Sequence, residues 1–303
     1  MAKKHTIERA PLVPFGLVGA LSLTVGWRPL IDTFSLAWQN DQYTHILLIL
    51  PVAVTLICVD WQTPSRRQEV DSPLGLIFLG LAGLTAGLSI LESAFLAVDL
   101  RLSLSMLALV IWWVGAFILC FGVRVARSRL FPLCLLLGLV PIPQLTLAEI
   151  INGLQQGSAF AAQVLFATIG IPVVQQGVTL TIPGLTIEVA QDCSSIRSSS
   201  MLLITTMVLA HLVLRSPWRK ALAIAIAVPL SVAKNGLRIF TIAMLGTRVD
   251  PAYLNGRLHH QGGIVFFTIS LAAVGLLLWR LRNGEAHGLV CPPAAQRATP
   301  IGD

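Results

Sequence analysis

Apolar residues are grouped along the chain in long runs that short polar connections separate. Eight of these runs approach the length of roughly 20 residues that a helix needs to cross a lipid bilayer. They fall at about residues 12–27, 44–59, 74–91, 103–122, 130–143, 194–213, 221–245 and 262–279. The pattern therefore predicts an all-α polytopic membrane protein with about eight transmembrane helices.

The longest connection, residues 144–192, has apolar residues of its own. From Leu147 to Ile169 they recur at near-helical spacing. This spacing predicts either an amphipathic helix lying at the outer membrane surface or one more buried helix. Further along, the alternating segments 178–182 and 185–189 flank a Pro-Gly pair. Such a pattern is typical of a small β-hairpin, which here directly precedes the helix over 194–213.

The composition agrees with a membrane protein. Of the 303 residues, 55% are hydrophobic and 12% are charged, whereas soluble domains carry about 25% charged residues. A soluble globular protein, a disordered chain and a nucleic-acid-binding protein are therefore all disfavoured. The net charge of +7 is explained by basic loops that lie in the cytoplasm.

Basic residues mark every second connection between the apolar runs, which predicts that both termini are cytoplasmic. The clusters are Lys3/Lys4/Arg9, Arg66/Arg67, Arg124/Arg127/Arg129, Arg215/Arg219/Lys220 and Arg280/Arg282. No small-residue cleavage pattern follows the first apolar run, so we expect that run to be a retained helix. We expect one integral membrane domain over residues 1–285, followed by a flexible cytoplasmic tail over 286–303.

Ionisable residues are costly inside a membrane and are functional candidates by default. Cys193 precedes the sixth apolar run, Arg238 lies in the seventh, and His259 and His260 precede the eighth. These residues are far apart in the sequence. The predicted topology nevertheless places all of them near the outer face of the membrane, where they can form one site.

The residue types in this group suit nucleophilic catalysis. The thiolate is the reactive form of cysteine, and both a helix N-terminus and a nearby cation favour it; Cys193 has the first, and Arg238 can supply the second. A histidine can act as a base and then protonate a leaving amine. The guanidinium of Arg238 can hold an oxyanion.

Each candidate also has a structural interpretation. Cys193 can be a small buried apolar residue, Arg238 can pair with Asp192 or Glu188, and the histidines can lie in an interfacial loop. Lys234 shares a helix face with Arg238, as a supporting charge or as the lining of a wet cavity. Arg197 faces the same cavity or pairs with Asp192. The supporting residues that we consider are Asp192, Ser194, Arg197, Lys234, Asn235, His260 and His45.

Three segments resemble the exosortase/archaeosortase family of membrane cysteine enzymes. They are Val189-Ala-Gln-Asp-Cys-Ser-Ser-Ile-Arg197, Lys234-Asn-Gly-Leu-Arg-Ile239 and His259-His-Gln-Gly-Gly-Ile-Val-Phe-Phe267. Cys193, Arg238 and His259 match the family's cysteine, arginine and histidine in order and spacing. His259 is preferred to His260 because Gly263 and Phe267 stand at the family's offsets from it.

Two upstream segments extend the resemblance to about residues 40–283. Tyr43-Thr44-His45 is similar to the family's Tyr-Ser-His element. Arg129-Leu-Phe-Pro132 and Val140-Pro-Ile-Pro143 are similar to its stretch from Arg-x-x-x-Phe-Pro to Pro-x-Pro. One departure is Ser195, which stands where the family usually has glycine and leaves the subfamily open.

The resemblance implies a membrane cysteine protease/transpeptidase in the bacterial cytoplasmic (inner) membrane, with its site on the periplasmic face. Its substrates would be exported proteins whose C-terminal tails (PEP-CTERM-like) consist of a short motif, a transmembrane helix and a basic cluster. The implied roles are nucleophile for Cys193, oxyanion or thiolate stabiliser for Arg238, and general acid/base for His259. The acceptor would be a surface glycan or lipid, and membrane lipids surround the enzyme.

Another class of function remains open on the sequence. A polytopic secondary transporter would use Arg197, Lys234 and Arg238 as a basic substrate path, with helices broken near Pro229 and Pro251. No inverted repeat supports this alternative, and a structural membrane subunit is the simplest one. We expect no metal and no cofactor, because the Cys and His residues are not at ligand spacing. The five cysteines form no disulfide framework.

Overall fold

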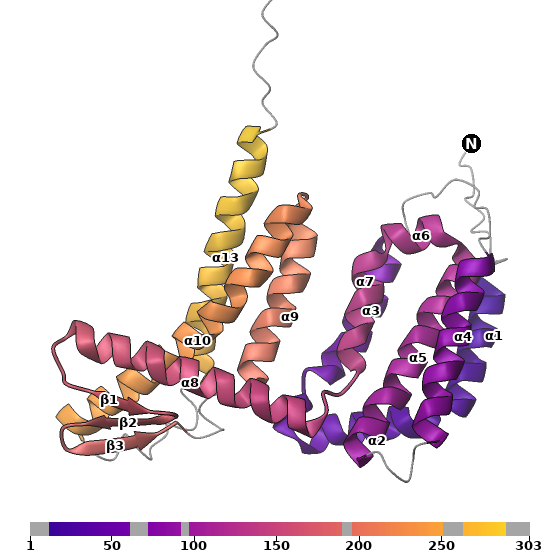
Figure 1. The fold of residues 1–303 in the computed structure, drawn as a ribbon. Helices are drawn as coiled ribbons and strands as arrows, with labels where there is room; N and C mark the ends of the chain where they lie inside the picture. The colour runs from indigo at the N-terminus through magenta and orange to yellow at the C-terminus, as the bar shows by residue number, and fades with distance from the viewer. Residues whose placement is uncertain (1–11, 61–71, 92–96, 190–195, 251–262, 289–303) are drawn as a thin grey trace, which may run out of the picture. The chain divides into compact units, whose positions relative to one another are not determined.

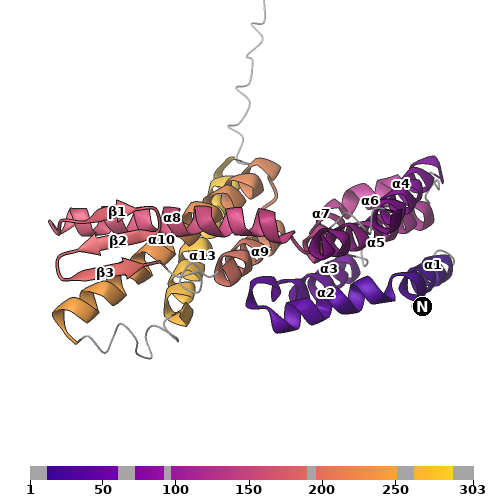
Figure 2. The ribbon, with the colours of Figure 1, turned by 60° about the horizontal axis from the view of Figure 1, so that its bottom comes forward.

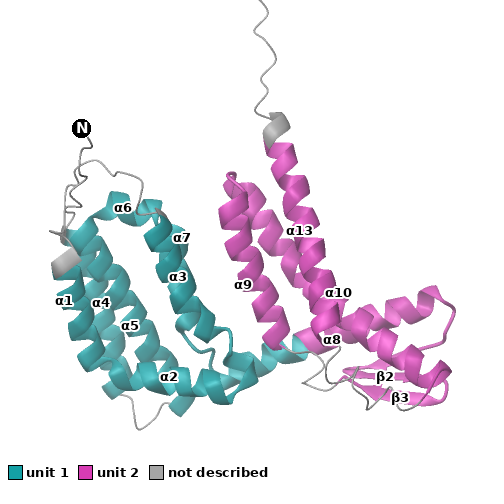
Figure 3. Ribbon diagram, turned by 180° about the vertical axis from the view of Figure 1, so that it is seen from behind, with its two compact units in different colours: residues 1–153 teal, residues 154–303 magenta. Residues whose placement is uncertain are grey.

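The computed structural model describes residues 12–60, 72–91, 97–189, 196–250 and 263–288. The chain divides into two compact units, residues 1–153 and residues 154–303 (Figure 3). Helix α8 (Gln144–Thr168) crosses the boundary between the two units. Each unit is described below by itself.

Unit 1 is built from helices. These are α1 (Leu12–Val25), α2 (Trp27–Gln39), η1 (Asp41–Tyr43), α3 (Ile46–Asp60), α4 (Ser72–Leu91), α5 (Val98–Phe121), α6 (Val123–Ser128), α7 (Leu130–Leu135) and η2 (Leu136–Leu139). Helices α4 and α5 lie side by side (Figure 1). They approach closely at Gly75, where an added Cβ would meet the Cβ of Leu119 at 2.9 Å. Small residues allow such close packing between membrane helices.

A sharp break follows η2 at residues 140–143. The helical stretch Leu130–Leu139 and helix α8 are bent by 102° relative to each other. Pro141 and Pro143 have no N–H group and interrupt the helical hydrogen-bond ladder. Two side chains of unit 1 bind the backbone carbonyl groups at the break. The hydroxyl of Tyr43 donates to the carbonyl of Ile142 at 2.7 Å, and the hydroxyl of Ser103 donates to the carbonyl of Pro141 at 2.7 Å.

Unit 2 combines α8 with a small sheet and long helices. Its further elements are β1 (Val174–Gln176), β2 (Thr179–Ile182), β3 (Leu185–Glu188), α9 (Ile196–Val213), α10 (Pro217–Arg248) and α13 (Gly263–Gly288). The three strands are antiparallel in the order β1-β2-β3. In Figure 2 the sheet lies along α8. The connection between α9 and α10 is bound to α13. The carboxylate of Glu285 in α13 accepts the backbone N–H of Ser216, which directly precedes α10, at 2.8 Å.

The predicted hairpin is confirmed as β2 and β3. Ile182 pairs with Leu185 across the Pro183-Gly184 turn, and Gly184 has a φ of +84°. A left-handed φ after proline is the signature of a type II turn and favours glycine. The sequence analysis did not predict β1, a strand of only three residues with little apolar alternation.

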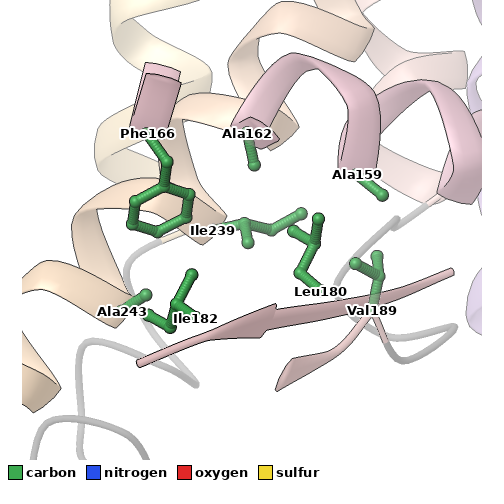
Figure 4. Close-up of a cluster of buried hydrophobic side chains, with 8 residues drawn as sticks. All are labelled: Ala159, Ala162, Phe166, Leu180, Ile182, Val189, Ile239 and Ala243. Carbon is green, nitrogen blue, oxygen red and sulfur yellow. The ribbon is translucent and has the colours of Figure 1, made fainter. Parts of the chain in front are cut away.

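A buried apolar core joins α8, the sheet and α10 within unit 2. The cluster consists of Ala159, Ala162, Phe166, Leu180, Ile182, Val189, Ile239 and Ala243 (Figure 4). Phe166 also meets Phe240 edge-on, with 5.0 Å between ring centroids. A second cluster unites α9, α10 and α13 through Leu202, Ala210, Leu214, Ala223, Val274 and Leu278. The sheet is therefore fixed to the helix that carries Arg238.

The protein is a multi-pass membrane protein. Within the described residues, six helices are long and apolar enough to cross a membrane, and the bent pair at the break would make a seventh. The six are Asp41–Val59, Pro73–Leu91, Val98–Phe121, Ile196–Val213, Pro217–Arg248 and Gly263–Glu285. The sequence predicts eight membrane helices, and two of the predicted runs are not among these six. The run over 12–27 forms a shorter apolar helix, Pro14–Val25, and the run over 130–143 ends at the proline break.

Candidate functional site

A row of polar side chains lines one face of α10. Ser231, Lys234, Asn235 and Arg238 follow the spacing i, i+3, i+4 and i+7, so they share one face of the helix. All four are buried, with exposed fractions of 3%, 5%, 1% and 8%. We call this row the polar stripe. Burying such groups costs free energy unless they find partners, which makes the stripe the strongest candidate site among the described residues.

The first turns of α9 supply partners for the polar stripe. The ammonium of Lys234 donates a hydrogen bond to the hydroxyl of Ser198. The hydroxyl of Ser231 donates to the hydroxyl of Ser199 at 2.9 Å, and this contact is buried. Arg197, the preceding residue of α9, is exposed. Two serines of α9 are therefore hydrogen-bond partners of the stripe.

Close packing fixes α10 at the level of Arg238. An added Cβ on Gly236 would meet the Cβ of Ala161 in α8 at 2.5 Å, a distance that real Cβ atoms essentially never show. Ile239, the residue after Arg238, enters the core shared by α8 and the sheet (Figure 4). The guanidinium of Arg238 is thus carried by a stretch of α10 with little freedom to move.

The chain that leads toward Cys193 is anchored at Val189. The N–H of Val189 donates to the carbonyl of Val178 at 3.0 Å, and its side chain is 1% exposed. The side chain of Gln155 in α8 donates to the carbonyl of Val189 at 2.7 Å. Val189 is therefore held through its backbone and its side chain.

The structure describes some of the predicted site residues and not others. Lys234, Asn235 and Arg238 lie together on the polar stripe, while Arg197 is exposed at the start of α9. His45 is half-buried at the start of α3 in unit 1. The remaining predicted residues, Asp192, Cys193, Ser194, His259 and His260, lie outside the described residues.

Several residues of this region were missed from the sequence. Ser198, Ser199, Ser231 and Gln155 were not predicted to take part. Ser231 had a detectable signal, because it continues the helical spacing of Lys234 and Arg238 by one turn. For Gln155 no local signal was available, since its partner is a backbone carbonyl 34 residues away.

The described part of the chain contains no group of three or more His, Cys, Asp or Glu side chains that could hold a metal ion. The chemistry available at the polar stripe is that of two cations, an amide and serine hydroxyl groups. A guanidinium beside an ammonium can bind and orient an anionic or developing oxyanionic group.

Comparison with known families places these residues in context. The model of the transmembrane exosortase family (Exosortase_EpsH) matches residues 38–276. The chain belongs to this family. The match to the exosortases covers the polar stripe, the start of α9 and the three segments with Cys193, Arg238 and His259. No curated protein matches the chain, and no solved structure matches it.

The exosortase match also includes two segments that the structure joins in unit 1. Tyr43 belongs to the Tyr-Thr-His segment and Ile142 to the Pro-Ile-Pro segment, and the hydroxyl of Tyr43 donates to the carbonyl of Ile142. Tyr43 is 2% exposed. In this exosortase, therefore, the Tyr-Thr-His segment supplies a hydrogen-bond donor for a backbone carbonyl of the Pro-Ile-Pro segment.

Proposed function

We propose that the protein is a membrane cysteine endopeptidase/transpeptidase that cleaves C-terminal sorting signals of exported proteins. The observation that carries this proposal is the exosortase family match over residues 38–276, which includes the buried polar stripe with Arg238. The tails would be PEP-CTERM-like, with a short motif, a transmembrane helix and a basic cluster. The released carboxyl end would pass to a surface acceptor such as a glycan or lipid.

The reaction proceeds through a thioester. The thiolate of Cys193 adds to the scissile carbonyl carbon, and the guanidinium of Arg238 stabilises the negative charge that develops on the oxygen. When the C–N bond breaks, His259 gives its proton to the leaving amine. His259 then takes a proton from the acceptor nucleophile, which attacks the thioester and releases the Cys193 thiolate.

The described residues support this assignment on the side of Arg238. Its helix is packed against α8 at Gly236 and its side chain is buried, so the backbone that carries the guanidinium is in place before substrate arrives, which favours electrostatic stabilisation. Arginine keeps its charge at any working pH and offers a planar fork of donors. Lys234 and Asn235 are the supporting residues of the same stripe.

The topology belongs to the proposal as well. Both termini would be cytoplasmic in a bacterial inner membrane, and the site would face the periplasm. Alternating basic clusters support this orientation. A substrate tail would enter sideways from the bilayer, with its motif at the outer surface and its basic cluster in the cytoplasm.

Processing of a reporter tests the proposed function. The reporter carries a tripartite C-terminal tail from the same genome and is expressed with wild-type enzyme, with Cys193→Ala and with Cys134→Ala. Cys134 lies in α7 and is exposed, so it is a matched control for loss of a thiol. Mass spectrometry of the mature product identifies the cleavage position and separates hydrolysis from transfer.

Cleavage by wild-type enzyme and Cys134→Ala, and loss of cleavage in Cys193→Ala, is the expected result. Cleavage that persists in Cys193→Ala would remove Cys193 as the nucleophile and overturn the proposed mechanism.

A further inference from the structure

Helix α8 buries a long polar side chain that the reaction described above does not use. Gln155 is 8% exposed, whereas Glu149, Asn152 and Gln156 on the same helix are exposed. The amide nitrogen of Gln155 donates to the carbonyl of Val189 at 2.7 Å. The contact joins residues 34 positions apart, so the fold itself brings them together.

Burying the side-chain amide of Gln155 destabilises the fold unless the amide has a hydrogen-bond partner. An amide moved out of water without a hydrogen-bond partner costs about 1–3 kcal/mol by protein mutational data. An alanine, leucine or methionine at position 155 would avoid that cost and would still suit an amphipathic helix. Gln155 therefore contributes mainly through its contact with Val189.

Val189 is the last described residue before the segment that carries Cys193. Its N–H is bound to Val178, its side chain belongs to the core with Leu180 and Ile239, and its carbonyl is bound to Gln155. Of these three contacts, only the one with Gln155 fixes the peptide group that leads into residue 190. The direction of the chain at this point therefore depends on Gln155.

The other end of the same segment is also fixed. Ile196 is 8% exposed, and Ser198 and Ser199 are bound to Lys234 and Ser231 of α10. Only residues 190–195 separate these two fixed ends. The segment that carries Cys193 therefore begins at a peptide group bound by Gln155 and leads into a helix whose serines are bound to α10, the helix of Arg238.

We propose that Gln155 is a positioning residue that sets the place of the Cys193 thiol through the carbonyl of Val189. This inference rests on the proposed function. Gln155 does not touch the reacting atoms. Its effect is on the rate of attack, because a displacement of about 1 Å in a catalytic group can cost about 100-fold in rate.

The test compares Gln155→Met with Gln156→Met in the full-length protein. Methionine keeps the length of the side chain and removes the donor. Gln156 is the exposed neighbour on the same helix, so its substitution is a matched control. Folding is checked by the amount of protein in the membrane and by thermal unfolding in detergent.

Two properties are measured for each variant. The first is kcat and KM for cleavage of the reporter tail. The second is the rate at which iodoacetamide alkylates Cys193 between pH 6 and pH 10, measured by peptide mass spectrometry so that the other cysteines do not interfere. This second readout needs no substrate, so it tests the inference even if the reporter is not cleaved.

We expect Gln155→Met to lower kcat about 10- to 100-fold with little change in KM, and to displace the pH profile of Cys193 alkylation. Gln156→Met should match the wild type in both readouts. An unchanged kcat and an unchanged alkylation profile in Gln155→Met would overturn the inference. So would a raised KM at constant kcat, which would place Gln155 in substrate binding.

A second variant covers the case in which Gln155→Met does not fold. Gln155→Glu keeps the shape and a polar end, but an ionised carboxylate cannot donate to the carbonyl of Val189. Its Cys193 alkylation should differ from the wild type at high pH and approach it at low pH, where the protonated carboxyl group can donate. An alkylation profile equal to that of the wild type at every pH would overturn the inference. Loss of Cys193-dependent cleavage in the wild type would instead count against the proposed function.

Discussion

The hydroxyl of Ser231 donates a hydrogen bond to the hydroxyl of Ser199, one helical turn away from the contact between Lys234 and Ser198. Two membrane helices are thus joined through two adjacent polar pairs. Polar contacts of this kind specify how helices pair in a bilayer, where apolar packing alone does not distinguish helix from lipid. They also fix the register between the helix that follows Cys193 and the helix that carries Arg238.

The pair formed by Lys234 and Ser198 should be energetically coupled. In a double-mutant cycle with Lys234→Met and Ser198→Ala, we expect a coupling free energy of about 0.5–3 kcal/mol. The measurement is thermal or denaturant unfolding in detergent micelles. Lys220→Met, at the other end of α10, is the matched control and should show no coupling with Ser198→Ala. Additive effects of Lys234→Met and Ser198→Ala would contradict the prediction.

The guanidinium of Arg238 should matter for its shape as well as its charge. Arg238→Lys keeps a cation but loses the planar fork of donors, so we expect cleavage to fall about 100-fold, as when one oxyanion donor is removed. Single-turnover cleavage of the reporter tail measures the effect. Arg280→Lys makes the same chemical change at an exposed position of α13 and should leave the rate near that of the wild type. Equal effects at both positions would argue against a special role for Arg238.

The close approach of α10 and α8 should not tolerate a methyl group. Gly236→Ala would bring a Cβ to 2.5 Å from that of Ala161, and overpacking of this kind costs about 1–3 kcal/mol. We expect a lower unfolding temperature and reduced cleavage. Gly153→Ala is the control on α8, because nothing lies within 4 Å of its added Cβ. A fully stable Gly236→Ala would show that the helices can separate at no cost.

The contact between Tyr43 and Ile142 should stabilise unit 1. Tyr43→Phe keeps the buried ring but removes the donor at 2.7 Å from the Ile142 carbonyl, which costs about 1 kcal/mol or more when the acceptor stays buried. The free energy of unfolding in detergent provides the measurement. Thr85→Val is a suitable control, because the hydroxyl of Thr85 bonds only within its own helix. A destabilisation no larger than that of the control would contradict the prediction.

The sequence predicted the helical membrane architecture because apolar runs of bilayer length admit few other structures. The hairpin was predicted as well, since Pro183 and Gly184 together specify a tight turn. The strand β1 was missed because three residues carry too little pattern. The proline break shortened the run over 130–143, since Pro141 and Pro143 cannot continue a helix. Local pattern was therefore reliable where it was long or where a turn was chemically explicit.

The candidate site was predictable in part. Charged residues in an apolar run are conspicuous, so Lys234 and Arg238 were found, and both lie on the buried polar stripe. Their serine partners on α9 were not found, because a serine in a membrane helix commonly bonds to its own backbone. Which serine faces α10 depends on the rotation of α9, and that rotation is decided by the packing of residues such as Leu202 and Ala210 against α10 and α13. The roles of Cys193 and His259 stay predictions.

The break at residues 140–143 has a consequence for how the protein is made. Its side-chain partners, Tyr43 and Ser103, both precede it in the chain, and so does Asp99, whose carboxylate accepts the N–H of Gln144 at 2.7 Å. A ribosome synthesises these partners first, so the carbonyl groups freed by the prolines meet their donors without delay. A bilayer offers no water to bind them in the meantime. The side chain of Tyr43 spans the distance to the carbonyl of Ile142, so two cysteines at these positions would be too far apart for a direct disulfide. Nascent chains stalled soon after α8 should therefore already be crosslinked between Tyr43→Cys and Ile142→Cys by a bifunctional thiol reagent about as long as the tyrosine side chain. Failure to crosslink until the whole chain is released would show that the bend closes late.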